Sequence, residues 1–473
     1  MSRSWFLILF TFFLTVHIAL AEPLKRSKHR SHQNSETKGS ADSNSNPLLH
    51  SEPATNPSIA AGVTDNSGRI IVPSDYHVKY DGAQVFRVTV NNSKGRKRVN
   101  DLVDKGVVEK WRSNTTSIDI MAKADKLTAV KQYLEKAKLT YEVVLEDVQR
   151  AIDEENPDIS EEELALLTGR KGHRMTFHKY HRMEDIHGYL DYLAQTYPQL
   201  VNITDIGRSL EGRPLKVIQI ISGHPNAKRF WIDGGIHARE WITPATVTYI
   251  LSELVENREA QDEYLKKIDF YILPIVNPDG YEYTHTNERL WRKNRRQGTT
   301  CTGTDLNRNW GFHWGGVGSS KEQCQQIYAG SGPFSEPETQ AVSKFILANN
   351  AKMKAFVTFH SYGQYILYPW GYSKRVPQDY ADLDRVGRAA AEAMRLTGGG
   401  AYTVGNSAQL LYPAAGASDD WAKGVAKIKY AYTIELRDKG KYGFLLPASN
   451  ILPVGKESLA AVKAIASEIY KGK

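Results

Sequence analysis

The chain has 473 residues, of which 41% are hydrophobic and 24% are charged, and its formal net charge is +8. This length exceeds one ordinary hydrophobic core and predicts two or more folded units. Lys and Arg are interspersed with acidic residues along the chain, which argues against a nucleic-acid-binding protein.

The first 21 residues predict a secretory signal. Arg3 precedes an apolar run at 5–16, and small residues follow up to Ala21. The run is shorter than the roughly 20 residues that a membrane span needs, and no later stretch is apolar enough. We therefore expect a secreted protein without a membrane span. Residues 22–69 are polar and Ser- and Asn-rich, which predicts a disordered segment.

Residues 70–160 predict a small α+β domain. Strands and helices follow in the order β-α-β-β-α-β, which indicates an antiparallel sheet with two helices on one face. The segments are 83–90, 99–106, 107–112, 116–124, 126–138 and 140–148. This domain contains no catalytic cluster of His, Cys or Ser, so we expect it to assist another domain.

Residues 161–175 form an acidic, helix-prone connector that ends in a basic stretch. Arg170, Lys171, His173 and Arg174 lie close together beside two glycines. An exposed tip of this kind is a cleavage site for a trypsin-like protease. The alternative is an ordinary charged linker.

Residues 176–473 predict an α/β domain with a mixed, mostly parallel central sheet that helices cover on both faces. Near-continuous apolar strands alternate with helices along this part of the chain. The predicted strands are 215–222, 229–236, 269–278, 354–362 and 430–438, and the predicted helices are 243–257, 336–349 and 458–471.

Charged side chains follow three of these strands. His237 and Glu240 come after one strand, His360 ends a second and Glu435 ends a third. Ligands of open α/β sheets bind outside the carboxyl ends of the strands, so we expect these side chains to converge.

Two His and one Glu are a ligand set of catalytic zinc, with the fourth position left for water. His237, Glu240 and His360 could form such a set, although a structural role for His237 is the alternative. Glu435 could then take the proton of the zinc-bound water as general base. The alternative is that Glu435 is a structural partner of Arg437 or of a nearby backbone amide.

Two further segments are cationic. Arg289 and Arg292 lie in RLWRKNRR, and Asn307 and Arg308 lie in DLNRNW. Because guanidinium groups bind carboxylates bidentately, Arg308 with Asn307 could hold a terminal carboxylate, while Arg292 could face an oxyanion. A solvated basic face is the alternative.

Cys301 and Cys324 are the only cysteines, and in a secreted chain they predict one disulfide. Asn91, Asn114 and Asn202 each begin an Asn-x-Ser/Thr sequon, so we expect a glycoprotein.

Six motifs, GIHAREWITPA, LWRKNRR, DLNRNWGFHW, FHSYGQ, LYPAAGASDDW and ELRDKGKYGFLLPAS, occur in this order. The chain from about residue 70 onwards thereby resembles the secreted zinc metallocarboxypeptidases of the A/B type. The resemblance implies one zinc ion in a monomeric catalytic domain at 176–473 and an inhibitory pro-domain at 70–160. It also implies activation by a trypsin-like protease within 161–175, and peptide or protein C-termini as substrates.

The resemblance assigns roles to single residues. It implies zinc ligation by His237, Glu240 and His360, with Glu435 as general base and Arg292 polarising the scissile carbonyl. The residues implied to hold the substrate carboxylate are Asn307, Arg308 and Tyr412, and those implied to line neighbouring subsites are Arg239, Ser361, Tyr362 and Phe444. The spacing of Cys301 and Cys324 also resembles a disulfide of the family.

Asp419 in LYPAAGASDDW occupies the position at the base of the family's side-chain pocket. Members with Asp there prefer C-terminal Lys or Arg, and a buried carboxylate is costly without a cation. A helix N-cap role is the alternative, although Asp420 fits a cap better.

The expected protein is therefore a zinc exopeptidase that removes C-terminal Lys or Arg. The alternatives are the same chemistry on apolar or aromatic C-termini, a zinc amidohydrolase acting on N-acyl amino acids, and a non-catalytic binding homologue.

Overall fold

The computed structural model describes residues 63–64, 70–71, 77–169 and 171–472. The predicted signal at 1–21 and most of the polar segment at 22–69 lie outside these residues. β1 (Val63–Thr64) pairs antiparallel with β2 (Ile70–Ile71), so the expectation of disorder up to residue 69 does not hold for β1.

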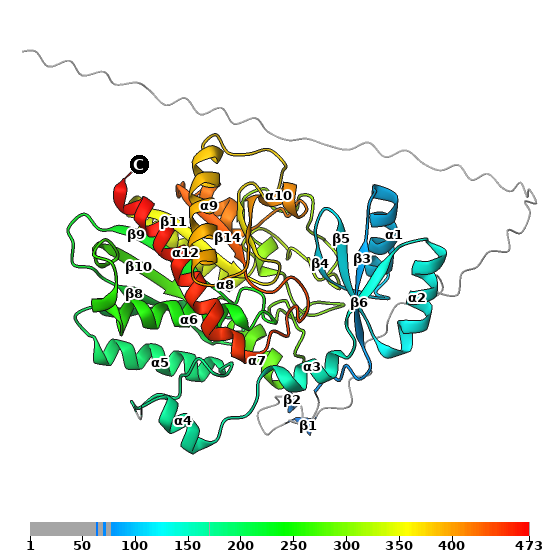
Figure 1. The fold of residues 1–473 in the computed structure, drawn as a ribbon, viewed down its shortest axis with the longest axis horizontal. Helices are drawn as coiled ribbons and strands as arrows, with labels where there is room; N and C mark the ends of the chain where they lie inside the picture. Colours follow the sequence, from blue (N-terminus) through cyan, green and yellow to red (C-terminus); the bar gives the residue numbers. More distant parts are fainter. Residues whose placement is uncertain (1–62, 65–69, 72–76, 170, 473) are drawn as a thin grey trace, which may run out of the picture. The chain divides into compact units, whose positions relative to one another are not determined.

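The smaller sheet has four antiparallel strands in the order β4-β5-β3-β6. Its elements are β3 (Gln84–Thr89), α1 (Ser93–Asp104), β4 (Glu109–Ser113), β5 (Ser117–Ala122), α2 (Leu127–Lys136) and β6 (Tyr141–Leu145). The predicted β-α-β-β-α-β order is confirmed, and α1 and α2 lie on the side away from the larger sheet (Figure 1). α1 begins earlier than predicted because the Asn92 side chain caps it, accepting a 2.8 Å hydrogen bond from the Gly95 amide.

Two helices, α3 (Val148–Glu155) and α4 (Glu161–Leu167), lead from this sheet to the larger one. The larger sheet has eight strands in the order β13-β12-β14-β11-β9-β10-β8-β7. The strands are β7 (Val201–Arg208), β8 (Pro214–Ile220), β9 (Lys228–Asp233), β10 (Ile268–Leu273), β11 (Met353–His360), β12 (Tyr365–Tyr368), β13 (Thr403–Asn406) and β14 (Tyr430–Glu435). The pairs β9–β10, β9–β11, β11–β14 and β12–β13 are parallel and the others antiparallel, which confirms the predicted mixed sheet.

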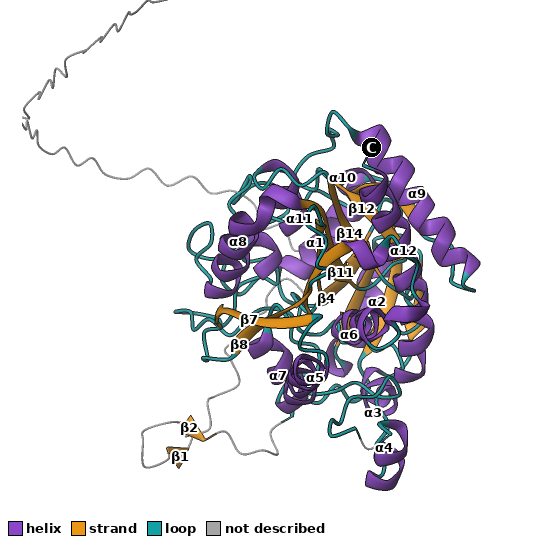
Figure 2. Ribbon diagram, turned by 90° about the vertical axis from the view of Figure 1, so that its left-hand side faces the viewer, coloured by secondary structure: helices purple, strands orange, loops and turns teal. Residues whose placement is uncertain are grey.

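Helices cover both faces of the larger sheet (Figure 2). One face packs against α5 (Met183–Thr196), α6 (Ile242–Val255), α9 (Tyr380–Leu396) and α12 (Ile451–Lys471), and the other against α8 (Pro337–Asn349) and α11 (Ser418–Gly424). α7 (Pro278–Thr286) and α10 (Ser407–Leu410) lie in connections. Successive side chains of β9 point to opposite faces of the sheet. Phe230 and Ile232 therefore pack in the hydrophobic core on one face, and Trp231 packs in the core on the other.

Three parallel neighbours, β14, β11 and β9, end at the same edge of the sheet. His360 and Glu435 are paired in register at the ends of β11 and β14. The chain that leaves β9 reaches His237 and Glu240 within a few residues. The sheet topology therefore gathers the charged strand ends that the sequence singled out.

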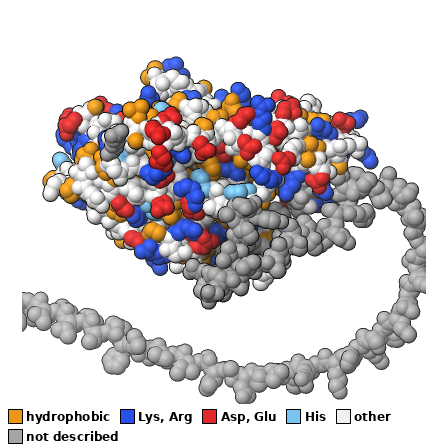
Figure 3. Space-filling view, turned by 90° about the horizontal axis from the view of Figure 1, so that it is seen from below, with side chains coloured by type: hydrophobic (Ala, Val, Ile, Leu, Met, Phe, Trp, Pro, Cys, Tyr) orange, Lys and Arg blue, Asp and Glu red, His pale blue; other side chains and the backbone are white. Residues whose placement is uncertain are grey.

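Two further sequence expectations concern the surface and the covalent structure. On the face shown in Figure 3, acidic and basic side chains are intermixed over the described residues. Cys301 and Cys324 form the expected disulfide.

Within the part of the chain that the structure describes, no helix combines the length and the apolar character required to cross a bilayer.

Candidate metal centre and active site

Glycines shape the turn that follows β9. Gly235 has φ +65, a left-handed conformation that favours glycine, and its amide donates a 2.9 Å hydrogen bond to Thr243 Oγ1. A Cβ atom on Gly234 would lie 3.0 Å from the Thr243 carbonyl oxygen. The two glycines thus allow the tight turn that presents His237 and Glu240 on the same side.

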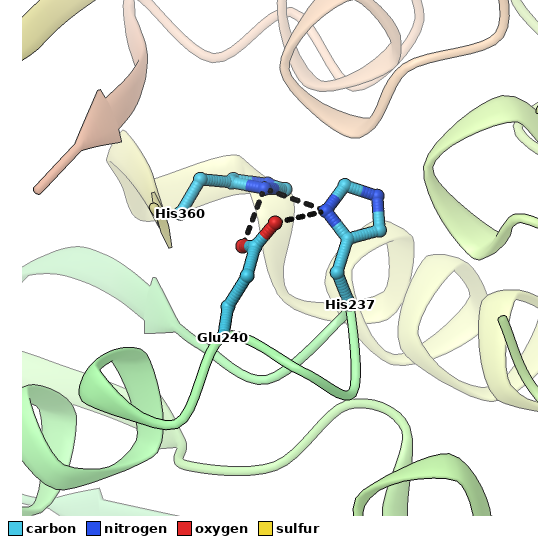
Figure 4. A group of neighbouring side chains, drawn as sticks. All are labelled: His237, Glu240 and His360. Atoms are coloured by element: carbon cyan, nitrogen blue, oxygen red, sulfur yellow. Dashed lines mark hydrogen bonds and ion pairs between the residues drawn. The ribbon is translucent and has the colours of Figure 1, made fainter. Parts of the chain in front are cut away.

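His237, Glu240 and His360 point toward one another (Figure 4). Glu240 Oε1 lies 2.9 Å from His237 Nδ1, and Glu240 Oε2 lies 3.3 Å from His360 Nδ1. The two Nδ1 atoms are 3.1 Å apart, and all three side chains are buried. Among the described residues, these three side chains form the group of His, Cys, Asp or Glu that is close enough together to hold a metal ion.

The three residues fit a zinc ion. Ligand atoms at zinc distances of about 2.0–2.1 Å in a tetrahedron lie about 3.3 Å from one another. Here the two Nδ1 atoms are 3.1 Å apart, and each lies 2.9 or 3.3 Å from a different oxygen of Glu240, so both carboxylate oxygens face the position of the ion. Two imidazole nitrogens that face each other this closely need a cation or a proton between them. Two His and one Glu are also the ligand set of catalytic zinc sites with an open fourth position.

Asp305 supports the metal ligand His237, a role that the sequence analysis missed. His237 Nε2 donates to Asp305 Oδ1 over 3.2 Å, which leaves the lone pair of Nδ1 for a metal. Arg292 Nη2 donates to Asp305 Oδ2 over 3.0 Å. Burial alone would raise the pKa of Asp305, but Arg292 and Arg308 outweigh it and hold this pKa well below its usual range. The sequence signal that could have pointed to Asp305 is its place two residues before Asn307, in the same motif as Arg308.

Replacing Asp305 with Asn should weaken zinc binding by about 10- to 100-fold, because His237 would lose the anion that orients it and raises its basicity. Competition titration of the zinc-free protein against a chromophoric chelator measures this affinity. Asp262→Asn, which neutralises an exposed carboxylate on the surface, is the control and should leave the affinity unchanged. An unchanged zinc affinity in Asp305→Asn would contradict the assigned support.

Glu435 ends β14 beside the metal ligands and is half-buried. Burial raises its pKa to about 7, against the opposing effects of His360 and Arg292. The alternative of a structural pair with Arg437 is wrong, because Arg437 binds Glu457 through contacts of 2.5 and 2.9 Å. Glu435 thus lies at the centre without an ion pair to Arg437, and its pKa lies near neutral pH.

A cavity of about 90 Å³ joins the centre to the predicted binding residues. Its lining includes Arg292, Asn307, Arg308, Ser361, Tyr362, Tyr412, Asp419, Glu435 and Phe444 together with the three metal ligands. Arg308 Nε donates to the Gly318 carbonyl over 2.9 Å, and Asn307 Oδ1 accepts from the Ser418 amide over 2.9 Å. These bonds fix two cavity side chains, and the pairing of Arg292 with Asp305 excludes a solvated basic face for Arg292.

Asp419 is 3% exposed and lines the same cavity. Burial raises the pKa of this carboxyl. A backbone amide, the attraction of His360 and the Thr433 side chain oppose this effect, and among the described residues no Lys or Arg pairs with Asp419. The carboxyl group is thus buried beside a cavity without a Lys or Arg partner among the described residues.

The alternative of a helix N-cap role is wrong for Asp419 and for Asp420. The N-cap of α11 is Ala417, and no side chain caps this helix. Asp420 instead accepts hydrogen bonds from the backbone amides of Gly371 and Tyr372 over 2.7 and 2.8 Å. Asp420 holds a neighbouring loop, which leaves Asp419 as the acid of the cavity.

The smaller sheet covers this cavity. Trp111, Arg112 and Ser113 of β4 contribute to its lining. Trp111 also packs against Phe444, with ring centroids 5.2 Å apart. The centre is therefore closed on one side by residues from the N-terminal part of the chain.

An ion pair and a hydrogen bond join the smaller sheet to two predicted subsite residues, Arg239 and Tyr362. Arg239 pairs with Glu109 and lies over the Phe444 ring at 4.1 Å from its centroid. The Tyr362 hydroxyl donates to Asp119 over 3.0 Å. Ser361 differs, because its amide donates to the metal ligand Glu240 over 3.1 Å.

A buried ion pair joins α3 to the part of the chain that forms the larger sheet. Arg289 binds the Glu155 carboxylate, with Nη2 donating over 2.8 Å, and both side chains are buried. The same guanidinium donates to the Phe444 carbonyl over 3.0 Å and stacks on Trp241 at 3.8 Å. Breaking such a buried pair from one side is costly, so α3 is firmly held.

Comparison with known proteins agrees with this geometry. Residues 186–461 match the family model "Zinc carboxypeptidase", and residues 86–155 match "Carboxypeptidase activation peptide". Carboxypeptidase B of Astacus astacus is 48% identical over 62% of this chain and 98% of its own length. Carboxypeptidase A4 of Mus musculus is 38% identical over 83% of this chain and 94% of its own. The crystal structure of thrombin activatable fibrinolysis inhibitor has a TM-score of 0.75 and 34% identity, covering 83% of this chain and all of that one.

Proposed function

The chain belongs to the zinc carboxypeptidase family, and we propose that it is a secreted pro-enzyme that removes Lys or Arg from the C-termini of peptides and proteins. It is a metallocarboxypeptidase with an activation peptide, which implies inhibition by its own pro-domain. We assign 1–21 to the signal, 70–160 to the pro-domain, 161–175 to the activation connector and 176–473 to the catalytic domain. The family and the activation peptide favour this function over an amidohydrolase or a binding homologue.

The reaction is hydrolysis of the last peptide bond. Zinc, when held by His237, Glu240 and His360, supplies a Lewis acid that lowers the pKa of bound water to about 7. Glu435 would take a proton from the attacking water and return it to the leaving amine. Its pKa of about 7 supports this role, because the same group must accept and then donate a proton.

The cationic and amide side chains would position the substrate. Arg292 would face the oxyanion that develops as water adds to the carbonyl. Asn307, Arg308 and Tyr412 would hold the terminal carboxylate, which limits cleavage to the last residue. Their shared cavity with the metal ligands supports this assignment.

Asp419 carries the specificity proposal. A buried carboxylate without a cation is costly, and a Lys or Arg side chain of the substrate would supply one. The acid is 3% exposed and lies on the lining of the cavity that contains the metal ligands. Relatives named carboxypeptidase A and relatives named carboxypeptidase B both match the chain, so this residue decides the substrate class that we propose.

The trypsin-cleaved enzyme should hydrolyse blocked dipeptides ending in Arg with a kcat/KM about 10³-fold above that for Phe or Glu, since only a basic side chain pairs with Asp419. Steady-state assays on the three substrates measure this ratio. The uncut pro-enzyme is the control and should be nearly inactive. A preference for the Phe substrate would contradict the proposed class while leaving the carboxypeptidase chemistry intact.

A further inference from the structure

The basic stretch before the catalytic domain contains more than one bond that a protease could use. We propose that activation cuts the Lys171–Gly172 bond, and that the mature enzyme keeps residues 172–174. This inference rests on the proposed pro-enzyme function, and it concerns a bond that the comparisons leave open. Arg170 lies outside the described residues, and the structure separates Lys171 from Arg174 by how firmly the chain after each of them is held.

The chain at Lys171 and Gly172 is exposed. The Lys171 side chain forms a 3.1 Å ion pair with Glu256 and is 51% exposed. The Glu256 side chain is 18% exposed, and a pair that is open to solvent at its lysine contributes little, so Lys171 can be released into the pocket of a protease. Gly172 is exposed, and a Cβ atom placed on it would meet nothing within 4 Å. A protease can therefore approach this bond from several sides.

The residues after Arg174 are fixed. Met175 and Thr176 are buried, at 5% and 4% exposure. The Thr176 amide and hydroxyl lie 3.0 and 3.1 Å from His181 Nε2, and the opposite nitrogen of His181 lies 3.1 Å from Asp185. Cleavage after Arg174 would require these two residues to leave the core and break both contacts.

The residue before Arg174 is also held. The His173 ring packs between Tyr189 and Tyr192, with centroids 4.9 and 4.6 Å away. The Met175 amide donates to His173 Nδ1 over 3.2 Å. A protease binds extended chain on both sides of the bond it cuts, so cleavage at Lys171 has to release His173, whereas cleavage at Arg174 has to release His173, Met175 and Thr176. The local opening needed at Arg174 is therefore larger. The His173 packing also explains why residues 172–174 would remain on the mature enzyme.

Limited digestion of the full-length pro-enzyme tests the proposal. An endoproteinase specific for Lys should produce a mature fragment whose N-terminal sequence begins at Gly172. With this protease, Lys171→Gln should slow cleavage of the connector by at least about tenfold. The matched variant Arg174→Gln should leave the rate of tryptic cleavage within about twofold of the unmodified chain.

A tryptic fragment that begins at Met175 would overturn the proposal, as would an unchanged rate for Lys171→Gln with the Lys-specific protease. N-terminal sequencing and intact mass need no activity assay. A fragment that begins at Gly172 but shows no carboxypeptidase activity would therefore support the cleavage site and count against the proposed function. The two proposals thus fail in different measurements.

Discussion

Replacing Glu435 with Gln should lower kcat on the best C-terminal substrate by about 10³-fold or more, because the amide cannot take the proton of the attacking water. The side chain keeps its size at the end of β14, so the sheet should be undisturbed. Glu435 is not one of the three metal ligands, and the zinc content should remain at one ion per chain.

Steady-state kinetics of the activated variant, together with metal analysis of the same preparation, measures both effects. Glu263→Gln removes a carboxylate with 78% exposed side chain on the surface and is the matched control. A kcat of Glu435→Gln within about tenfold of that of the unmodified enzyme would contradict the assignment of Glu435 as general base. Loss of zinc would instead assign Glu435 a part in metal binding.

The gathering of the metal ligands could be predicted because it follows from strand order. His360 and Glu435 end apolar segments, and His237 with Glu240 follows another such segment. Apolar strands between helices indicate a largely parallel sheet, whose carboxyl ends share one edge. The structure makes the three strands direct neighbours, β14-β11-β9, and the predicted convergence is confirmed.

Asp305 could not be assigned in the same way. It belongs to the loop that carries Asn307 and Arg308, not to a strand end, and its contact with His237 depends on how that loop folds back. The sequence contains many acidic residues in loops, and spacing does not distinguish the one that supports a metal ligand. Only the three-dimensional arrangement shows its bonds to His237 and Arg292.

The contacts between the part of the chain that forms the smaller sheet and the part that forms the larger sheet could not be predicted from the sequence either. Glu109 and Arg239 are 130 residues apart, and Glu155 and Arg289 are 134 apart. Helical and strand periodicity describes neighbours along the chain, whereas these pairs depend on the docking of one folded unit on another. The sequence predicted an assisting domain, and the structure adds which of its acids contact the predicted subsites.

Replacing Asp419 with Leu should reverse the substrate preference. We expect kcat/KM for substrates ending in Arg to fall by about 10³- to 10⁴-fold, because the substrate cation would enter an apolar pocket without a partner. Activity on substrates ending in Phe or Leu should rise, since the cost of a buried, unpaired carboxylate disappears. The position is buried on the cavity lining, so the change acts where the substrate side chain would lie.

Steady-state assays on matched Arg, Lys and Phe dipeptides measure the reversal, and Asp419→Asn separates charge from shape. Asn keeps nearly the same volume, so a loss of Arg activity in Asp419→Asn isolates the ion pair from the fit of the pocket. Asp420 remains bound to the amides of Gly371 and Tyr372 in both variants, which preserves the loop beside the pocket. If both variants keep the Arg preference, the cation is held elsewhere. In that case a buried acid on the cavity lining is not sufficient to set the substrate class, and the basis of the specificity proposal is lost.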